Sequence, residues 1–552
     1  MMDQFEPRIL KVLGADDYRP VVAQELARVL NVRKKQREAF RDALKRLADS
    51  NRIRIGKKGR IRLTADSGFV VGVVRKISSG AAFVVPAERT PELRGGDIYI
   101  SSSDIRDAQT GDEVLVRLTS RRRSGGQRCG RIEKILERAS NVFVGTYFER
   151  AGQGFVRVDG TAFADAIHVG DPGARGAVPD DKVVIEMLRF PTPTRTGEAV
   201  LTKVLGKRGD PGVDTMTVVH SLGIPYEFSE AVLEEARQQA EIFDETIPAD
   251  RTDLTAETII TIDPADARDF DDAISLTRSD DGHWHLGVHI ADVAHFVRPG
   301  GQIDSEARNR GTSVYLPRHV IPMIPEVISN GLASLQQGVV RFTKTVFIEF
   351  DGQGNVIGTD IANSAIRVCR RFAYEEVMPI IRQPRKKFDN VTPEVRQLLH
   401  GMFDLAMILR KKRFDHGALQ MGVPEIEIDF DRDGVVTGAH ERPHDESHEI
   451  IEEFMLAANI AIAQLLSSRN IPFLRRVHGT PDELRMRAFQ DFCQGLGLTL
   501  KKIQSRSEIQ KLIHDAEGKP EQRAVNFALL RSMKQAEYSP EELGHYALSE
   551  DD

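Results

Sequence analysis

Acidic side chains are concentrated in one short stretch of this chain, IDPADARDFDDA at residues 262–273. Five aspartates fall within ten residues of it. Four of them are Asp263, Asp269, Asp271 and Asp272. Carboxylates this close repel one another unless cations lie among them, and hard divalent ions such as Mg²⁺ prefer oxygen ligands. The stretch therefore predicts metal-assisted chemistry at phosphorus, such as cleavage of a phosphodiester bond.

Two β-rich runs flank the acidic stretch. Residues 258–262 (TIITI) precede it, and residues 273–276 (AISL) follow it. Since β-branched and apolar runs of this length favour strands, we expect the aspartates in a turn between two strands. The alternative is a solvated acidic loop, which is the ordinary role of an Asp-rich turn.

The acidic string resembles the catalytic motif of the ribonuclease II and ribonuclease R family, I-D-P-x-x-A-x-D-x-D-D-A, at every specified letter. Four further strings resemble that family in order and approximate spacing. They are Ala291–Ala294, Tyr315–Pro317, Met323–Pro325 and Leu530–Ala536. The resemblance covers nearly the whole chain. It implies a Mg²⁺-dependent, hydrolytic 3′-to-5′ exoribonuclease that releases nucleoside 5′-monophosphates.

The resemblance also implies roles for particular residues. The four aspartates would hold the Mg²⁺ ion, and Asp272 would be the residue whose loss stops cleavage without preventing RNA binding. Tyr374 would stack on the terminal nucleotide, with packing at a helix start as the alternative. Tyr315 aligns with a second base-stacking aromatic residue. Asp292 and Asn459 are candidates for groups that support the site.

A predicted helix over residues 447–466 adds an argument from the residues themselves. Its apolar side chains lie nearly all round the helix, which indicates burial. Glu452 and Glu453 are then costly unless they are paired or used in chemistry. One alternative is an ion pair with Arg475 or Arg476. The resemblance implies an active-site glutamate at this point, and Glu453 aligns best.

The residues before the acidic stretch predict smaller modules. Residues 1–64 form three helical patterns and a basic β-hairpin, and they resemble a winged helix. Repeated short strands over 65–138 and 139–205 predict two OB-fold barrels of the cold-shock type. A connector is expected at 206–251, and a large mixed α/β catalytic domain of the ribonuclease II type at 252–552. The expected fold class is thus a multidomain α+β assembly.

The barrels are expected to hold single strands by stacking and by backbone electrostatics. Phe83 and Phe155 are candidate RNA-stacking residues, although an aromatic residue in a strand is more often part of the core. A basic, flexible loop is expected at the joint around residues 121–126. The N-terminal module favours ribonuclease R over ribonuclease II, and its cations suit phosphate contact, with protein contact as the alternative.

Composition sets further bounds on the chain of 552 residues, whose formal net charge is −6. Residues 1–63 carry 17 Lys/Arg against 8 Asp/Glu, a net of +9, which leaves −15 for the remainder. A basic end on an acidic body indicates a module that faces nucleic acid. Cys129, Cys369 and Cys493 have no metal-ligand spacing and favour a reducing, cytoplasmic setting.

The expected partner is single-stranded RNA, or structured RNA with a 3′ overhang. The ribosome and RNA-decay proteins are further candidates, and a monomer is expected. No signal peptide is visible, and the longest apolar run, residues 454–466, is too short to cross a bilayer. No membrane partner is therefore expected.

One departure from the family pattern lies after Gly544–Leu548. The family continues there into an arginine motif at the scissile phosphate and a final OB domain, whereas this sequence stops at Asp552. The expectation is either a fragment of a longer product or a truncation with impaired activity. The alternatives in function are an RNA-binding protein whose catalytic domain no longer cuts, and a DNA-binding regulator built on the winged helix. The latter would leave the acidic turn without a purpose.

Overall fold

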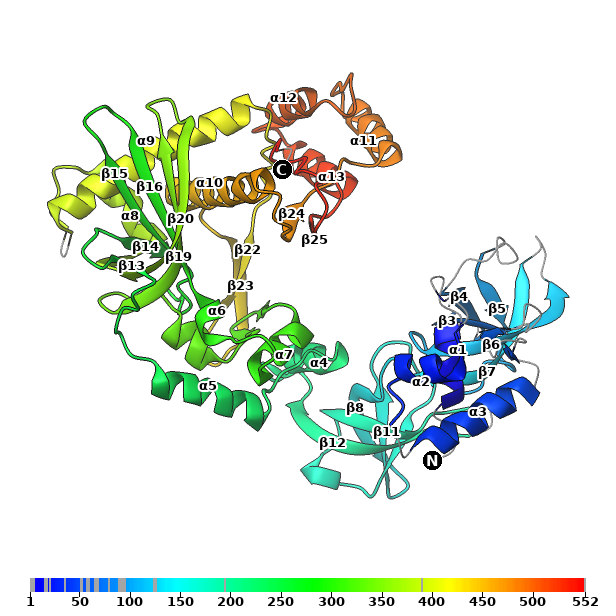
Figure 1. The fold of residues 1–552 in the computed structure, drawn as a ribbon. Coiled ribbons are helices and arrows are strands. Elements are labelled where there is room, and N and C mark those ends of the chain that lie inside the picture. The colour runs from blue at the N-terminus through cyan, green and yellow to red at the C-terminus, as the bar shows by residue number, and fades with distance from the viewer. Residues whose placement is uncertain are drawn as a thin grey trace. The chain divides into compact units, whose positions relative to one another are not determined.

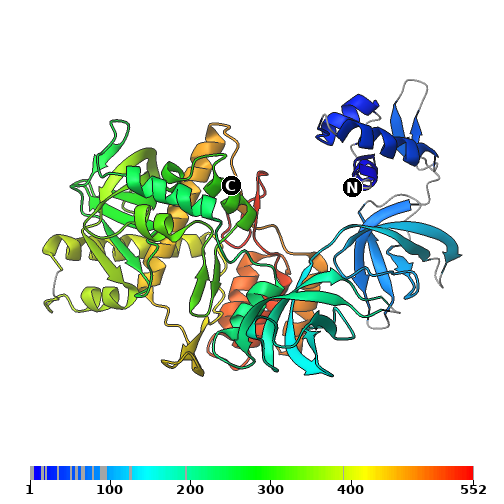
Figure 2. The same cartoon turned by 90° about the horizontal axis from the view of Figure 1, so that it is seen from below.

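The computed structural model describes residues 5–13, 18, 21–33, 36–49, 53–55, 60–63, 69–77, 80–87, 96–122, 127–192, 195–388 and 391–550. It divides into two compact units, Met1–Ile224 and Pro225–Asp552. Figures 1 and 2 show the helices and strands of each unit from two directions.

The first unit begins with helices and a short antiparallel strand pair. These elements are α1 (Phe5–Leu13), α2 (Ala23–Val29), α3 (Arg37–Asp49), β1 (Ile53–Ile55) and β2 (Ile61–Leu63). Ile9, Phe40 and Leu44 are buried together with Leu115 of the barrel that follows, so the helices share a core with that barrel. The order of elements is the expected one, but the turn at 56–59 lies outside the described residues. The winged helix itself remains a prediction.

Two closed five-stranded barrels complete the first unit, as expected for paired OB-folds. The first consists of β3 (Phe69–Lys76), β4 (Ala82–Pro86), β5 (Ile98–Ile100), β6 (Glu113–Arg122) and β7 (Arg128–Glu137). The second consists of β8 (Val142–Arg150), β9 (Gln153–Val158), β10 (Ile167–Gly170), β11 (Asp181–Arg189) and β12 (Glu198–Lys207). The repeat contained four strands per copy, and closure adds a fifth that pairs in parallel with β5 or β10.

The expected position of the basic loop was wrong. Strand β6 continues to Arg122 and β7 begins at Arg128, so this segment connects two antiparallel strands inside the first barrel. It does not join the two barrels. The reason is that the basic residues at 121 and 122 still pair in a strand, and residues 123–126 lie outside the described residues.

The second unit is built around one seven-stranded sheet. Its order is β13 (Thr252–Leu254), β20 (Val356–Arg367), β19 (Val340–Phe350), β16 (Trp284–Ala291), β15 (Asp272–Arg278), β14 (Ile260–Asp263) and β21 (Arg370–Ala373). The outermost pair at each edge is parallel, and the inner pairs are antiparallel. The strands that flank the acidic stretch are therefore neighbours near one edge.

Helices cover both faces of this sheet. One face packs on α8 (Tyr374–Arg382), α9 (Pro393–Asp415) and α10 (Glu446–Ser468), which Figure 1 shows grouped beside the strands. The other face packs, near the aspartates, on α5 (Glu230–Ile242), α6 (Val293–Phe296), α7 (Gln302–Arg310) and a π-helical turn η4 (Val327–Leu332). Alternation along the strands separates the two cores: Ile274 faces the first, and Ala273 the second.

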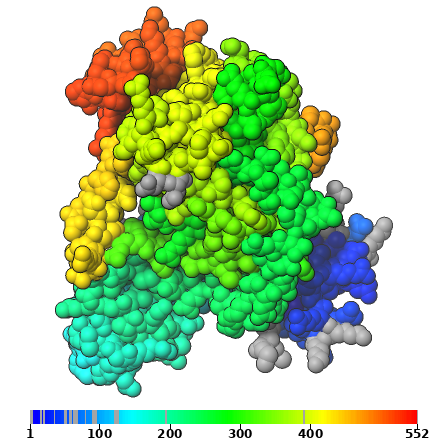
Figure 3. Space-filling view, turned by 90° about the vertical axis from the view of Figure 1, so that its left-hand side faces the viewer, coloured from blue at the N-terminus to red at the C-terminus, as the bar shows by residue number. Residues whose placement is uncertain are grey.

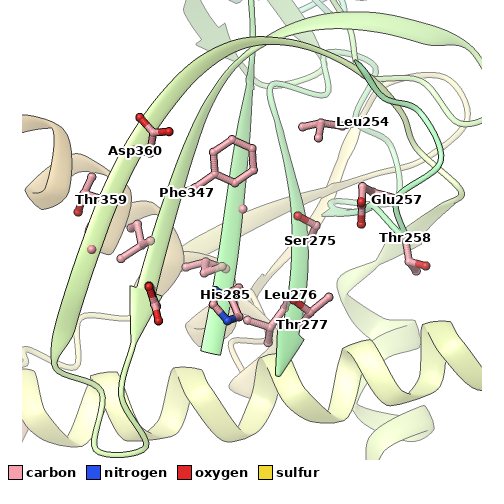
Figure 4. A pocket seen from close by; sticks show the side chains of 15 residues that line it. Leu254, Glu257, Thr258, Ser275, Leu276, Thr277, His285, Phe347, Thr359 and Asp360 are labelled. Atoms are coloured by element: carbon pink, nitrogen blue, oxygen red, sulfur yellow. The ribbon is translucent and has the colours of Figure 1, made fainter. Parts of the chain in front are cut away.

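The far end of the second face is less covered and carries a cavity of 520 Å³. Figure 4 shows Ser275, Phe347 and Asp360 among its lining residues, which come from three neighbouring strands. None of the four signature aspartates lines it. The chemistry of the acidic stretch is therefore at the other end of the sheet.

The expected connector is divided between the two units. Helix α4 (Val213–Ser221) packs on β8 and β12 of the second barrel, whereas α5 packs on α7 and η4. Ser229 stands at the N-cap of α5 as expected, but its side chain makes no capping hydrogen bond.

Three hairpin-like strand pairs and three helices complete the second unit. They are β17 (Val314–Leu316) with β18 (His319–Ile321), β22 (Ile426–Phe430) with β23 (Val436–Glu441), β24 (Arg475–Val477) with β25 (Glu537–Ser539), α11 (Glu483–Gly495), α12 (Arg506–Ala516) and α13 (Gln522–Ser532). The three helices enclose their own small core, which includes Met486, Phe489 and Leu529. They form the orange lobe in Figure 3.

Helix α10 is longer than the apolar run in the sequence. Among the described residues, it alone has the length and composition of a membrane-spanning helix. However, Ile450, Phe454 and Ala458 are buried in the core between the helices and the sheet. We therefore describe α10 as a core helix.

Candidate active site

The acidic stretch lies in a turn between two strands, as predicted. Asp263 is the last residue of β14 and Asp272 is the first residue of β15. The two strands pair at Ile260 and Ile274, which brings their aspartate-bearing ends to the same end of the sheet. Asp263 is buried, Asp269 and Asp272 are half-buried, and Asp271 is the most exposed.

The turn is held by two side chains that sequence reasoning did not select. Arg371, on β21, donates through Nη2 to the carbonyl oxygens of Ala265 at 2.8 Å and Pro264 at 3.2 Å. Ser334 accepts from the backbone N–H of Phe270 at 3.1 Å. These bonds fix the backbone that carries the aspartates. No local pattern indicates Arg371 or Ser334, since their partners are far away in the sequence.

The four carboxylates act on one another electrostatically. Burial raises the pKa of Asp263 to about 7, and the charge of Asp272 adds to that shift. Burial raises the pKa of Asp272 to about 6, with a contribution from Asp271. Partial burial and the charge of Asp269 also raise the pKa of Asp271. The carboxylates therefore form a continuous chain of repelling neighbours.

A divalent cation fits the donors of this site. The Oδ2 atom of Asp263 is buried and has no hydrogen-bond partner, and a buried carboxylate oxygen without a partner is costly unless a cation neutralises it. Within the described residues, no three His, Cys, Asp or Glu side chains converge closely enough to hold a metal ion together. Repulsion between unscreened carboxylates favours such a spread arrangement. The aspartates thus supply suitable oxygens without forming a closed ligand set.

Tyr374 lies beside the aspartates because of the parallel pairing of β14 and β21. Ala373 is the strand partner of Asp263, and Tyr374 follows it as the first residue of α8. Burial raises the pKa of Tyr374 to about 12, and the charges of Asp272 and Asp263 contribute to this rise. The tyrosine expected to stack on a nucleotide is therefore within electrostatic reach of the carboxylates.

Tyr374 and Pro264 line a cavity of 810 Å³. Arginines, histidines and acidic side chains line it as well. They include Arg410, Arg413, Arg442, His444, His448, Glu441 and Glu452. The polar lining and the position next to the acidic turn make this cavity the candidate substrate site. His444 and His448 were not predicted; the only sequence signal is that His448 and Glu452 are four residues apart on one helix face.

The expected ion pair of α10 with Arg475 or Arg476 was wrong. Glu453 is 3% exposed and pairs with Arg413 of α9, whose Nη2 lies 2.5 Å from Oε1. Arg475 pairs with Glu542 instead. The reason is that α9 and α10 pack side by side, while β24 lies beyond the end of α10.

The two glutamates of α10 point to different cavities. Glu452 lines the cavity of Tyr374, whereas Glu453 lines a neighbouring one of 510 Å³. Burial raises the pKa of Glu453, although Arg413 opposes that rise. Glu452 therefore has the better position of the two for contact with a substrate, and Glu453 has the position of a buried ion-pair partner.

Three other predicted groups have identifiable surroundings. Tyr315 is 69% exposed, and its hydroxyl lies 3.4 Å from Oδ2 of Asp269, so it stands beside the acidic turn. Asp292 accepts from Arg251 at 2.6 Å and lies 3.4 Å from Nζ of Lys344. Asn459 is exposed on α10.

The candidate stacking residues of the barrels are half-buried. Phe83 packs edge-on against Tyr99, with ring centroids 5.7 Å apart. Phe155 stacks on Phe148 at 5.7 Å and meets the edge of His168 at 5.4 Å. Partly exposed aromatic groups of this kind are compatible with base stacking and with ordinary packing.

Comparison with known proteins gives the same assignment. An RNB domain model matches residues 251–552, a cold shock domain model residues 155–229, and a ribonuclease B OB domain model residues 72–135. The chain is 35% identical to ribonuclease R of Thermotoga maritima, over 97% of this chain and 75% of that protein. The chain belongs to the ribonuclease R family. The activity that this membership supports is exoribonuclease hydrolysis of RNA.

Other members of the ribonuclease R family agree with this result. The protein from Aquifex aeolicus is 31% identical over 99% of this chain and 76% of its own length. The structure of Mycoplasma genitalium RNase R with ribose-methylated single-stranded RNA has the same fold, with a TM-score of 0.78 and 24% identity over 87% of this chain and 75% of that one. The fold class expected from sequence is confirmed for the barrels and for the catalytic unit.

Proposed function

We propose that this chain degrades RNA from its 3′ end and releases nucleoside 5′-monophosphates, with Mg²⁺ held by Asp263, Asp269, Asp271 and Asp272. The observation that carries the proposal is the buried, unpartnered Oδ2 of Asp263 within a series of mutually repelling carboxylates. A bound Mg²⁺ ion supplies an activated water and charge stabilisation in phosphodiester hydrolysis.

The protein's own residues prepare the site for this reaction. Arg371 and Ser334 fix the backbone of the acidic turn. Asp272, on the first residue of a central strand, is held rigidly and is the carboxylate that we expect to be needed most for cleavage. Tyr374 remains protonated near neutral pH, because its pKa is about 12, and it offers a neutral ring next to the charged groups.

The substrate proposed is RNA with an unpaired 3′ end. Solved structures of Mycoplasma genitalium RNase R include complexes with ribose-methylated single-stranded RNA and with double-stranded RNA. The complex with double-stranded RNA has a TM-score of 0.70 and 26% identity over 76% of this chain. The barrels of the first unit add aromatic residues of a kind that stacks bases without regard to sequence. Selection of RNA over DNA would rest on contacts to the 2′-hydroxyl group.

The test is a cleavage assay on the whole chain. The purified protein is incubated with 5′-labelled single-stranded RNA or DNA of one sequence, with Mg²⁺ or with a chelator. We expect a ladder that shortens from the 3′ end, with RNA and Mg²⁺ only, and nucleoside 5′-monophosphates as the product on chromatography. Asp272→Asn should bind RNA without shortening it.

The other outcomes identify the alternatives. Binding of RNA by the unmodified chain without shortening, at any divalent metal tested, would favour an RNA-binding protein that does not cut. Binding of duplex DNA alone would favour a DNA-binding regulator. Shortening of RNA in the presence of chelator would contradict the role given to the metal.

A further inference from the structure

Three aromatic rings stack in series in the cavity of Tyr374. The rings of Tyr374 and His448 lie face to face, with centroids 3.9 Å apart and planes 10° from parallel. His444 continues the series beyond His448, at 5.0 Å and 23°. The three residues come from the start of α8, the first turn of α10 and the segment before α10. We call this series the ring stack.

The middle ring is held in place by the cap of α10. The backbone N–H of Asp445 donates to Nδ1 of His448 at 3.3 Å, and the carboxylate of Asp445 accepts from the backbone N–H of Ser447 at 3.0 Å. This reciprocal arrangement is a capping box, in which the third residue of the helix bonds back to the cap. The orientation of His448 is therefore set by its own helix, before any ligand binds.

The ring stack covers one face of Tyr374. A base that stacks on that face must displace a ring that is fixed by a helix cap, which is costly. His444, by contrast, is exposed and lines the cavity. The series thus carries an aromatic surface from the tyrosine beside the aspartates to an exposed imidazole.

Cationic side chains accompany the stack. Arg442 lines the same cavity, two residues before His444, and its charge acts on the pKa of both Tyr374 and His448. Arg442 lies 3.6 Å from Glu425, a longer separation than that of the buried pair between Arg413 and Glu453. A flat aromatic surface with an arginine beside it is the chemistry that binds an unpaired nucleotide, through its base and its phosphate.

We propose that the ring stack is a base-positioning surface, on which an unpaired base of the RNA strand stacks against His444 while His448 acts as a fixed spacer in place of a base. This inference rests on the proposed function. His448 and His444 are positioning residues, and the ligand is any nucleotide with a π-face, so the preference is for unpaired RNA and not for a sequence. Stacking on an aromatic side chain changes the dissociation constant between about fivefold and a hundredfold per base.

The experiment uses the full chain in chelator, with single-stranded RNA that carries 2-aminopurine at one of its last four positions in turn. Stacking quenches the fluorescence of this base. We expect strong quenching at one position or at two adjacent positions, loss of that quenching in His444→Ala, and a dissociation constant about tenfold higher. His440→Ala is the matched control, because His440 is exposed on the neighbouring hairpin, pairs with Asp429 and does not line the cavity.

Two substitutions of His448 separate its ring from its role in the helix cap. His448→Gln retains an acceptor for the N–H of Asp445 but removes the ring, whereas His448→Phe retains a ring but removes the acceptor. We expect the Gln variant to lose the quenching and the Phe variant to keep it. With Mg²⁺ present, KM should rise about tenfold in His448→Gln and His444→Ala, while kcat stays within about twofold.

The outcomes distinguish this inference from the proposed function. If the unmodified chain shortens RNA, but His444→Ala and His448→Gln match it in quenching, dissociation constant and KM, the ring stack does not position bases. If the Gln variant keeps the quenching and the Phe variant loses it, His448 acts through the cap and the inference is also overturned. If the unmodified chain neither binds nor shortens RNA, the proposed function fails first.

Discussion

The carboxylates of Asp263 and Asp272 stand at the adjoining ends of two paired strands, and the charge of Asp272 adds to the effect of burial on the pKa of Asp263. Two carboxylates coupled in this way release their protons as a pair, in steps that belong to both. The same coupling makes the pair a strong ligand for a divalent cation, since one ion neutralises both charges.

Without a metal, ionisation of Asp263 should destabilise the folded protein. Its pKa of about 7 in the folded chain lies above the ordinary value of about 4, so the folded state binds the proton more tightly than the unfolded state does. This stabilisation is complete below about pH 4 and is lost as the pH rises through 7. In chelator, Asp263→Asn should therefore melt several degrees above the unmodified chain at pH 8, but at nearly the same temperature at pH 5. An equal difference at both pH values in thermal melts would contradict the assigned burial of this carboxylate.

Divalent cations should stabilise the second unit through the same carboxylates. A ligand that binds only the folded state adds about 2.7 kcal/mol at a hundred times its dissociation constant. We expect Mg²⁺ to raise the melting temperature of the unmodified chain in a concentration-dependent manner, and to have little effect on Asp263→Asn or Asp272→Asn. Differential scanning fluorimetry across a Mg²⁺ titration measures this directly. A similar shift in all three proteins would mean that the ion binds elsewhere.

Asp272→Asn should reduce kcat at least about a hundredfold, because it removes a charge where the reaction needs one, and should leave the dissociation constant for RNA within about twofold. Asp280→Asn is the matched control, since Asp280 is an exposed aspartate at the other end of the same strand, outside the turn. Single-turnover cleavage and filter binding give the two quantities. An equal loss in both variants would point to an effect of net charge on RNA association.

Arg413 and Glu453 should be strongly coupled in stability. Arg413→Met leaves a buried carboxylate unpaired, which costs about 3 kcal/mol in the free energy of unfolding. The double variant Arg413→Met/Glu453→Leu should recover a large part of this loss, because it removes the unpaired charge as well. Lys411→Met, which breaks an exposed pair with Asp415 on the same helix, should cost less than about 0.5 kcal/mol. Urea unfolding of the four chains measures the coupling, and additive effects would exclude it.

The sequence predicted those features of the site that depend on neighbours along the chain. The aspartate turn was predictable because β-rich runs flank it on both sides, and the first residue of α8 was predictable as an aromatic position from the family pattern. Arg371, Ser334 and Arg413 were not, because each contacts a segment 39 to 107 residues away, and such contacts depend on how the elements pack. The choice between Glu452 and Glu453 failed for the same reason: adjacent residues on a helix face different sides, and only the packing of α9 decides which side is the cavity.

The barrels followed a similar rule. Four strands per copy were visible as a repeat with glycine punctuation, whereas β7 and β12 carry mixed polar patterns that do not repeat. Their place in the fold is set by barrel closure, since each is the strand that pairs with β5 or β10. A closed sheet requires a last strand even where the local pattern for it is weak.

The parallel pairing of Asp263 with Ala373 has a consequence for biosynthesis. A span of 110 residues separates the two strand partners, so β14 leaves the ribosome well before β21 can align with it. At about 5–20 residues per second, this interval lasts roughly 5–20 s. During that time the growing polypeptide holds its acidic turn without Arg371 and Tyr374, and therefore carries no assembled centre toward the messenger from which it is being translated.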